Sequence, residues 1–403
     1  MVSRRLFLQS SAAIAACRGL GLDSCFAANA PGVTDTEIKI GQTMPYSGPA
    51  SAYGVIGRTE GAYFKMINEL GGINGRTLQL LSLDDGYNAA KTVEQTRRLV
   101  EQEQVALIFN SLGTPPNLAI RNYLNDNKVP QLFVAAGAAM FGDPQNFPWT
   151  IGFQPNNPME ARIYAKHILA TKPDAKIGVL FQNDDFGKDY LIGIRQVLGP
   201  DRETMIVKEV SYELSEPTVD SQIVALQGAG VDTFVIAALP KFGALAIRKT
   251  YDIGWSPVRY LSNVSTSVVA TLKPAGLDKS KGVIAARYAK DATDARWKDD
   301  AGYKEWAAFV AKYMTAAELI DVNAAYGFSV AATLVQVLKQ CGDDLSRNNI
   351  MRQATNLKDF ELPMLLPGIK VNTSQDNFYP IRQERLGRFN GESWDLFGDL
   401  MSD

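Results

Sequence analysis

The sequence predicts an α/β protein made of two similar lobes, each a parallel sheet flanked by helices. Two observations support this prediction. Strand-like and helix-like segments alternate from residue 36 onward, and a proline-bracketed extended segment at residues 147–155 interrupts the alternation. Alternation of this kind is typical of parallel sheets with right-handed crossovers. Because the same pattern starts again after the interruption, we expect two lobes joined by crossing segments.

The first predicted unit covers residues 36–57. Ile38 and Ile40 alternate with polar neighbours, as in a strand, and the sequence Ser47-Gly48-Pro49 favours a turn. Ser51 is predicted to cap the helix of small and apolar residues that follows. A strand that leads into a helix N-terminus presents free backbone N–H groups, which suit an anionic group of a ligand.

Further segments of the same kind complete the first lobe. The predicted strands are residues 77–83, 105–109 and 130–135, and the predicted helices are residues 88–104 and 116–128. The run at 105–109 is short and wholly apolar, which is typical of a strand buried on both faces.

The second run begins after residue 155. Its predicted helices are residues 159–170, 189–198, 218–229 and 242–253, and its predicted strands are residues 176–181, 205–211, 233–237 and 258–262. Two more helices are predicted at residues 303–312 and 322–340, and two more crossings at residues 282–288 and 366–371. We therefore expect residues 33–153 and 287–366 in lobe 1, and residues 154–286 and 367–403 in lobe 2.

Residues 1–30 are predicted to be an export signal of the twin-arginine type. Arg4 and Arg5 precede an apolar stretch, and small residues follow as far as Ala30. The run Ile14-Ala15-Ala16-Cys17 also matches a lipoprotein box, so a lipid anchor at Cys17 is the alternative. No later stretch approaches the roughly eighteen apolar residues of a membrane helix. The sequence therefore predicts a periplasmic protein that is soluble or tethered by lipid.

The composition argues against several classes of function. A formal net charge of −2 gives no electrostatic footprint for nucleic acid. His167 is the one histidine and Cys341 the one cysteine beyond the signal, so we expect no zinc site and no other metal site. The first strand is not followed by Gly-x-Gly-x-x-Gly, and no Gly-x-Ser-x-Gly occurs. The adjacent carboxylates Asp84-Asp85 and Asp184-Asp185 are predicted to bond within loops or to cap helices. We therefore expect neither a cofactor nor catalysis.

The predicted ligand-binding loops lie beyond the carboxyl ends of the strands, where open parallel sheets bind ligands. They are residues 45–53, 110–116, 135–140, 182–187, 238–242 and 262–267. Small, hydroxyl, amide and aromatic residues dominate these loops, and charged side chains are few. Such a lining favours holding a ligand over transforming it.

Several short motifs, taken in order, resemble the leucine/isoleucine/valine-binding proteins, which are type I periplasmic solute receptors of ABC importers. They are Ser47-Gly48-Pro49, Tyr53-Gly54, Gly71-Gly72-Ile73-Asn74-Gly75, Asp84-Asp85, Asp185-Phe186-Gly187 and Leu366-Pro367-Gly368-Ile369. The resemblance covers nearly all of the chain after the signal. It implies a two-lobe α/β fold of the type I periplasmic binding protein class, with three crossing segments that let the lobes close over a solute. It also implies a monomer that delivers this solute to a membrane permease.

The resemblance further implies which residues bind the solute. In lobe 1, Tyr53 would line the pocket, and Gly113 and Thr114 would bind a ligand carboxylate through backbone and hydroxyl groups. The next loop would contribute Ala136 and Ala138. In lobe 2 the corresponding residues are Phe186, Leu239, Asn263 and Val264.

Three of these positions depart from the pattern of amino-acid binders. Ala138 replaces a hydroxyl residue, Leu239 replaces an aromatic residue, and residues 262–265 lack the acid that would hold an α-ammonium group. A buried ammonium group without an anionic partner is costly. The expected solute is therefore a small amino acid or a carboxylate without an amine, such as an aromatic or aliphatic acid. A sensory ligand-binding protein on the same fold and an exported α/β enzyme are the alternative functions.

Overall fold

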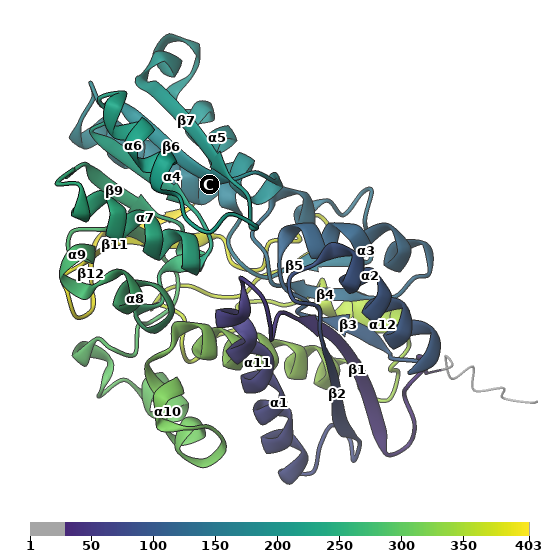
Figure 1. Cartoon of the computed structure of the whole chain (residues 1–403). Coiled ribbons are helices and arrows are strands. Elements are labelled where there is room, and N and C mark those ends of the chain that lie inside the picture. Colours follow the sequence, from purple (N-terminus) through teal and green to yellow (C-terminus); the bar gives the residue numbers. More distant parts are fainter. Residues whose placement is uncertain (1–28, 403) are drawn as a thin grey trace, which may run out of the picture.

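The computed structural model describes residues 29–402 and shows two sheets with helices packed around them (Figure 1). The predicted export signal, apart from residues 29 and 30, lies outside the described residues, and so does Cys17. Within residues 29–402, no helix is both long enough and apolar enough to span a bilayer.

The first sheet has the strand order β2-β1-β3-β4-β5, and every neighbouring pair in it is parallel. Its strands are β1 (Glu37–Met44), β2 (Thr77–Asp84), β3 (Leu107–Phe109), β4 (Gln131–Val134) and β5 (Thr150–Gly152). Strands β3, β4 and β5 are buried along their whole length, as apolar runs of this kind predict. The extended segment at 147–155 supplies the edge strand β5 before the chain leaves this sheet.

Helices α1 (Gly54–Glu69) and α11 (Val322–Cys341) pack against each other, as do α2 (Ala89–Arg97) and α3 (Thr114–Asp126). Gly327 permits the first contact, because a Cβ atom there would lie 2.8 Å from the carbonyl oxygen of Ile56. The predicted Ser51 cap is wrong. Ser51 lies inside a 3-10 turn, Ser51–Tyr53, that leads directly into α1, and no side chain caps either element.

The second sheet has the strand order β12-β11-β10-β9-β8-β6-β7. Its parallel strands are β6 (Ile177–Gln182), β7 (Ile206–Tyr212), β8 (Thr233–Ala237), β9 (Val258–Leu261) and β10 (Ile284–Arg287). The antiparallel hairpin of β11 (Gln383–Phe389) and β12 (Trp394–Ser402) extends this sheet beyond β10. This hairpin was not predicted from the sequence.

The helices of the second lobe are α4 (Asn157–Thr171), α5 (Asp185–Leu198), α6 (Asp220–Gly228), α7 (Pro240–Asp252) and the short α8 (Lys273–Ala275) and α9 (Leu277–Ser280). Helix α4 packs against α5, and α6 packs against α7. The remaining α-helices of the described residues are α10 (Ala301–Tyr313) and α12 (Arg347–Ala354), and α12 packs against α11.

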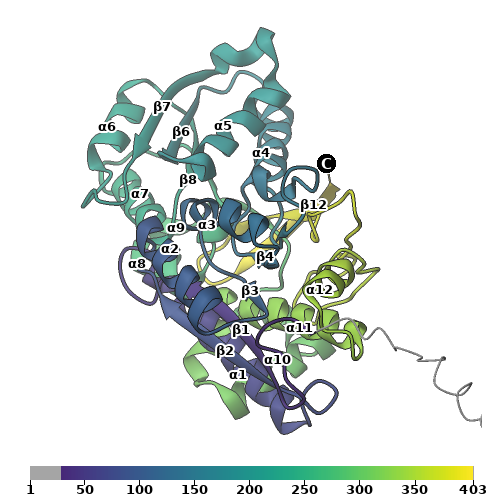
Figure 2. The ribbon, with the colours of Figure 1, turned by 90° about the vertical axis from the view of Figure 1, so that its right-hand side faces the viewer.

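The chain passes between the two sheets three times. The passages follow β5, β10 and α12, and Figure 2 shows the last part of the chain, in yellow, crossing back to form β12 near the C-terminus. Two passages contact each other, since the backbone N–H of Leu366 donates to the carbonyl of Tyr288 at 2.9 Å. Within residues 366–371, Val371 forms an isolated bridge with Phe360, and the range contains no strand.

Candidate binding site

A cavity lies between the two lobes, with an empty volume of about 750 Å³ that includes a part open to solvent. Eight of the nine predicted site residues line it: Tyr53, Gly113, Thr114, Ala136, Phe186, Leu239, Asn263 and Val264. The ninth, Ala138, does not, because its side chain is buried in a small cluster with Val134 and Phe141. Its predicted role is therefore not supported by its position.

Tyr53 bridges the lobes directly. Its hydroxyl group donates a 2.8 Å hydrogen bond to the carbonyl oxygen of Val264 in the opposite lobe. Burial raises the pKa of the Tyr53 hydroxyl well above its ordinary value, so the group keeps the proton that it donates. This contact describes a closed arrangement of the lobes.

Gly113 and Thr114 place the N-terminus of α3 at the cavity. Gly113 has φ +99°, and a Cβ atom there would lie 2.4 Å from the ring of Tyr87, which covers this turn. Thr114 is the first residue of α3, and the two prolines that follow it have no N–H group. Because these prolines remove two N–H donors from the first turn, the Thr114 hydroxyl and the helix dipole are what favour an anionic group here.

Asn263 is held by a buried acid behind the cavity wall. Glu160 accepts the backbone N–H of Asn263 at 2.8 Å and also its side-chain amide. Its carboxylate accepts two more bonds, from the hydroxyls of Tyr164 at 2.6 Å and Tyr190 at 2.7 Å. Burial raises the pKa of Glu160 to about 7, and these donors oppose the shift. Burial, and then the charge of Glu160, also raise the pKa of Glu384.

Several polar lining residues that were not predicted lie in the loop after β2, on the crossing segments and at the start of α11. They are Gln154, Arg287 and Asn323, together with the tyrosines Tyr87, Tyr288 and Tyr326. The strand ends gave a signal for four of them. Tyr87 comes three residues after β2, Gln154 comes two residues after β5, Arg287 is the last residue of β10, and Tyr288 follows it. The rule that selected the other loops therefore predicts these residues as well.

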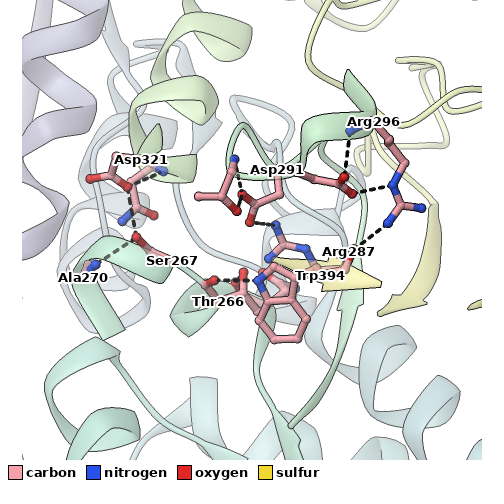
Figure 3. Close-up of polar contacts among 12 residues, drawn as sticks. Thr266, Ser267, Ala270, Arg287, Asp291, Arg296, Asp321 and Trp394 are labelled. Atoms are coloured by element: carbon pink, nitrogen blue, oxygen red, sulfur yellow. Dashed lines mark hydrogen bonds and ion pairs between the residues drawn. The ribbon is translucent and has the colours of Figure 1, made fainter. Parts of the chain in front are cut away.

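Arg287 is the one charged residue in the lining formed by residues 29–402. Its side chain is 3% exposed, and its guanidinium Nη2 lies 3.4 Å from Oδ2 of Asp291. The guanidinium carbon also lies 5.0 Å from the ring centroid of Trp394, which the β11-β12 hairpin supplies (Figure 3). Thr293 donates its backbone N–H and hydroxyl to Asp291 and so fixes this carboxylate.

A second contact joins the lobes at the start of α11. Ser267 donates through its hydroxyl to Oδ1 of Asp321, the N-cap of α11, at 3.1 Å (Figure 3). The same oxygen accepts the backbone N–H of Asn323 at 3.0 Å. The lobe-2 loop and the first turn of α11 thus share one carboxylate beside the cavity.

The predicted structural roles of the acidic pairs are confirmed. Asp84 accepts the backbone N–H groups of Tyr46, Ser47 and Gly86, and Asp184 caps α5 by accepting the N–H of Gly187.

His167 is half-buried, and its Nδ1 lies 2.6 Å from the hydroxyl of Tyr260. Among residues 29–402, no group of three or more histidine, cysteine or acidic residues has an arrangement that could hold a metal ion.

Two α/β lobes that close on a lined cavity define a type I periplasmic binding protein. The chain belongs to the periplasmic binding protein family, whose model matches residues 37–391. An amino acid binding protein of Pseudomonas aeruginosa is 24% identical over 301 residues, which cover 70% of this chain and 73% of that protein.

Two solved structures show the same fold. A branched-chain amino acid ABC transporter protein of Thermus thermophilus with bound valine has a TM-score of 0.82 and 16% identity, and the match covers 92% of this chain and 98% of the other. A fatty acid ABC transporter substrate-binding protein of Thermomonospora curvata has a TM-score of 0.76 and 20% identity, with 93% and 95% covered. The family and fold predictions are thus confirmed.

Proposed function

We propose that the protein is the periplasmic solute-binding component of an ABC importer of the branched-chain amino acid type. It holds one small solute between its lobes and passes it to a membrane permease. The observation that carries this proposal is the convergence of Tyr53, Thr114, Phe186 and Asn263, from both lobes, on one cavity. Family membership supports it, as do the transport roles in the names of the Thermus and Thermomonospora proteins.

The proposed solute is a carboxylate without an amine, such as an aromatic or aliphatic acid. The cavity lining within residues 29–402 contains no Asp or Glu to balance an ammonium group. Thr114 at the positive end of α3 is the proposed contact for the carboxylate. An amino acid is the second candidate, supported by the name of the Pseudomonas relative and by the valine in the Thermus structure.

Export, oligomeric state and lobe boundaries complete the proposal. Residues 1–30 direct export by the twin-arginine route, with a lipid anchor at Cys17 as the alternative. The protein acts as a monomer without cofactor or catalysis, and the lobe boundaries fall at the three passages between the sheets. A partner of a membrane sensor would bind solute in the same way. Loss of solute uptake in a deletion strain distinguishes importer from sensor.

A thermal-shift screen tests the solute class. The protein is first unfolded and refolded to remove any co-purified solute, and is then screened against matched amino acids and their amine-free analogues. A true ligand at 100 times its Kd stabilises the protein by about 2.7 kcal/mol. We expect acids without an amine to raise the Tm. A response to amino acids alone would support the second candidate, and no response to either would refute the proposed solute class.

A further inference from the structure

The first turn of α3 offers a solute few hydrogen-bond donors. Pro115 and Pro116 have no N–H group. Tyr87 covers the turn, because a Cβ atom on Gly113 would lie 3.0 Å from the Tyr87 hydroxyl oxygen. Burial raises the pKa of this hydroxyl, and a contact from the backbone N–H of Thr114 is among those that oppose the rise. A carboxylate at α3 thus meets a hydroxyl group and the helix dipole, neither of which carries a full charge.

Arg287 brings the one full charge to the cavity lining formed by residues 29–402, and most of its donors are free. Its Nη2 contacts Oδ2 of Asp291, whereas Nε and Nη1 make no hydrogen bond within the described range. Neither of these two atoms is among the fully enclosed side-chain atoms that lack a partner, so solvent reaches them. Because Arg287 is 3% exposed and lines the cavity, the cavity is the space from which a solute reaches these donors.

The pairing of Arg287 with Asp291 is loose. The distance is 3.4 Å, whereas charge-assisted N–H···O contacts are usually about 2.7–2.9 Å. Oδ1 of Asp291 accepts the backbone N–H and the hydroxyl of Thr293, so this carboxylate has donors besides the arginine. A buried guanidinium group with free donors calls for a further partner. A carboxylate suits this role, because it accepts two parallel bonds from one edge of the group.

The Arg287 side chain is held beside the lining by the β11-β12 hairpin. Its stem packs on Gly387, where a Cβ atom would lie 3.2 Å from Cγ of Arg287. Its guanidinium carbon lies 5.0 Å from the ring centroid of Trp394 (Figure 3). Nε1 of Trp394 donates to the carbonyl of Thr266 at 3.3 Å, and Thr266 also lines the cavity. A side chain ordered in this way loses little conformational freedom when it binds a solute.

We propose that Arg287 binds the carboxylate of the solute through Nε and Nη1 and thereby makes the cavity select acids over neutral analogues. This inference rests on the proposed function, because it assumes that the cavity holds a solute with a carboxylate. It places the charged partner of that carboxylate on a passage between the lobes and leaves Thr114 as an uncharged contact. Amine-free acids and amino acids both carry a carboxylate, so the inference applies to either candidate solute.

Titration calorimetry with acids and their primary amides tests the inference. The pairs are benzoate and benzamide, hexanoate and hexanamide, and leucine and leucinamide. An amide keeps the size of the acid and loses its negative charge. In at least one pair, we expect the acid to bind about ten-fold or more tightly than the amide. Equal or tighter binding of the amides overturns the inference and leaves binding of acids by the cavity intact. Failure of every compound to bind refutes both proposals.

Variants show whether Arg287 is the source of the preference. Arg287→Gln combined with Asp291→Asn removes both charges together, so no buried charge is left unpaired. In this double variant the advantage of the acid should fall below about three-fold, whereas Asp291→Asn alone should keep it. Arg388→Gln is the matched control, because Arg388 also lies over a ring of the hairpin, that of Phe397 at 5.3 Å, and lies outside the lining. An advantage that survives in the double variant contradicts the assignment.

Two further substitutions keep the test decisive if the double variant does not fold. Arg287→Lys keeps the charge and loses the two parallel bonds, so it should weaken binding of the acid by about three-fold or more. Unchanged affinity for the acid in Arg287→Lys would contradict a direct contact. Thr114→Val should leave the preference for the acid in place. Loss of the preference in Thr114→Val would place the carboxylate at α3, which overturns the inference and leaves the proposed function standing.

Discussion

The hydroxyl group of Tyr53 lies 2.8 Å from the carbonyl oxygen of Val264, a residue 211 positions further along the chain. Tyr53 precedes α1 in the first lobe, and Val264 follows β9 in the second. The two residues also line the cavity, so this contact couples closure of the lobes to enclosure of a solute. It can form only when the lobes are closed.

Removing this bond should weaken binding without weakening either lobe. We expect Tyr53→Phe to raise the Kd by the equivalent of about 0.5–1.5 kcal/mol, the usual net value of one hydrogen bond. The Tm of the solute-free protein should stay unchanged, since the bond belongs to the closed state. Tyr46→Phe is the matched control, because the Tyr46 hydroxyl bonds Ser82 within lobe 1 at 2.6 Å. Calorimetry that finds equal losses of affinity in the two variants would contradict a role in closure.

Phe186 should act as an anchor for the solute. Its ring lines the cavity and meets Tyr190 edge-on, with centroids 5.7 Å apart. We expect Phe186→Ala to cost about 1–3 kcal/mol of binding free energy, as for other anchoring aromatics, with a small change in the Tm of the free protein. Phe234→Ala is the control. Phe234 is fully buried against Trp255 away from the cavity, so its truncation should lower the Tm strongly. Full affinity in Phe186→Ala would refute the anchor.

Periodicity and turn residues were sufficient to predict the parallel strands and most helices. Local signals of this kind are strong where a strand is buried on both faces, as at residues 105–109 and 233–237. The β11-β12 hairpin was missed because its seven- and nine-residue strands alternate buried and exposed positions only irregularly. The Ser51 cap failed because a 3-10 turn and an α-helix share one sequence signal at their start.

The cavity residues on the loops of the two lobes were predicted better than the polar residues on the crossing segments. Strand-end loops are set by local sequence, so the loops that contain Tyr53 and Asn263 could be predicted from the strand pattern, and the family resemblance then singled out the two residues. Arg287 ends β10 and could have been found by the same rule, but its packing against Trp394, more than a hundred residues away, depends on a hairpin that the pattern did not reveal. Tertiary contacts of this kind leave no trace in local periodicity. Ala138 packs with Val134 and Phe141, so the lining of this loop ends one residue earlier, at Gly137.

Export should depend on the arginine pair near the N-terminus. Replacing Arg4 and Arg5 by lysine keeps the charge of the segment and removes the twin-arginine signature. We expect the double variant to accumulate in the cytoplasm, as measured by cell fractionation and immunoblotting. A single Lys replacement at Arg18, which lies later in the signal, serves as the control. Unchanged periplasmic levels of the double variant would mean that another route exports the chain.

Solute affinity should rise as the pH falls from 7 to 5. Asp189 of lobe 2 accepts the backbone N–H of Ala139 of lobe 1 at 2.8 Å, and burial raises its pKa from 3.8 to about 6. Opening the lobes returns the carboxylate to water and to its ordinary pKa, so closure takes up a proton between these two values. The affinity gain should be about ten-fold across this range.

Calorimetry at pH 7, 6 and 5 measures this dependence, and Asp189→Asn should remove most of it, because the amide oxygen still accepts the Ala139 N–H. The charges of Asp184 and Asp185 and the hydroxyl of Tyr379 face the same group, and they stay in place in both proteins. Titration of the solute and of Glu160, whose pKa burial raises to about 7, is common to both proteins and cancels in the comparison. An identical pH profile in wild type and variant would rule out Asp189 as its source.

Glu160 should act on binding through Asn263, without touching the solute. Its carboxylate accepts four hydrogen bonds, two of them from Asn263. In Glu160→Gln one oxygen becomes an N–H donor, which leaves at least one buried donor unpaired and displaces Asn263. We expect a loss of about 1–3 kcal/mol in binding together with a lower Tm. A purely structural role for Glu160 would lower the Tm alone.

A double-mutant cycle that combines Glu160→Gln with Asn263→Ala distinguishes the two roles. If Glu160 works by holding Asn263, the double variant binds no more weakly than Asn263→Ala, whereas additive losses of binding would show that the two residues act separately.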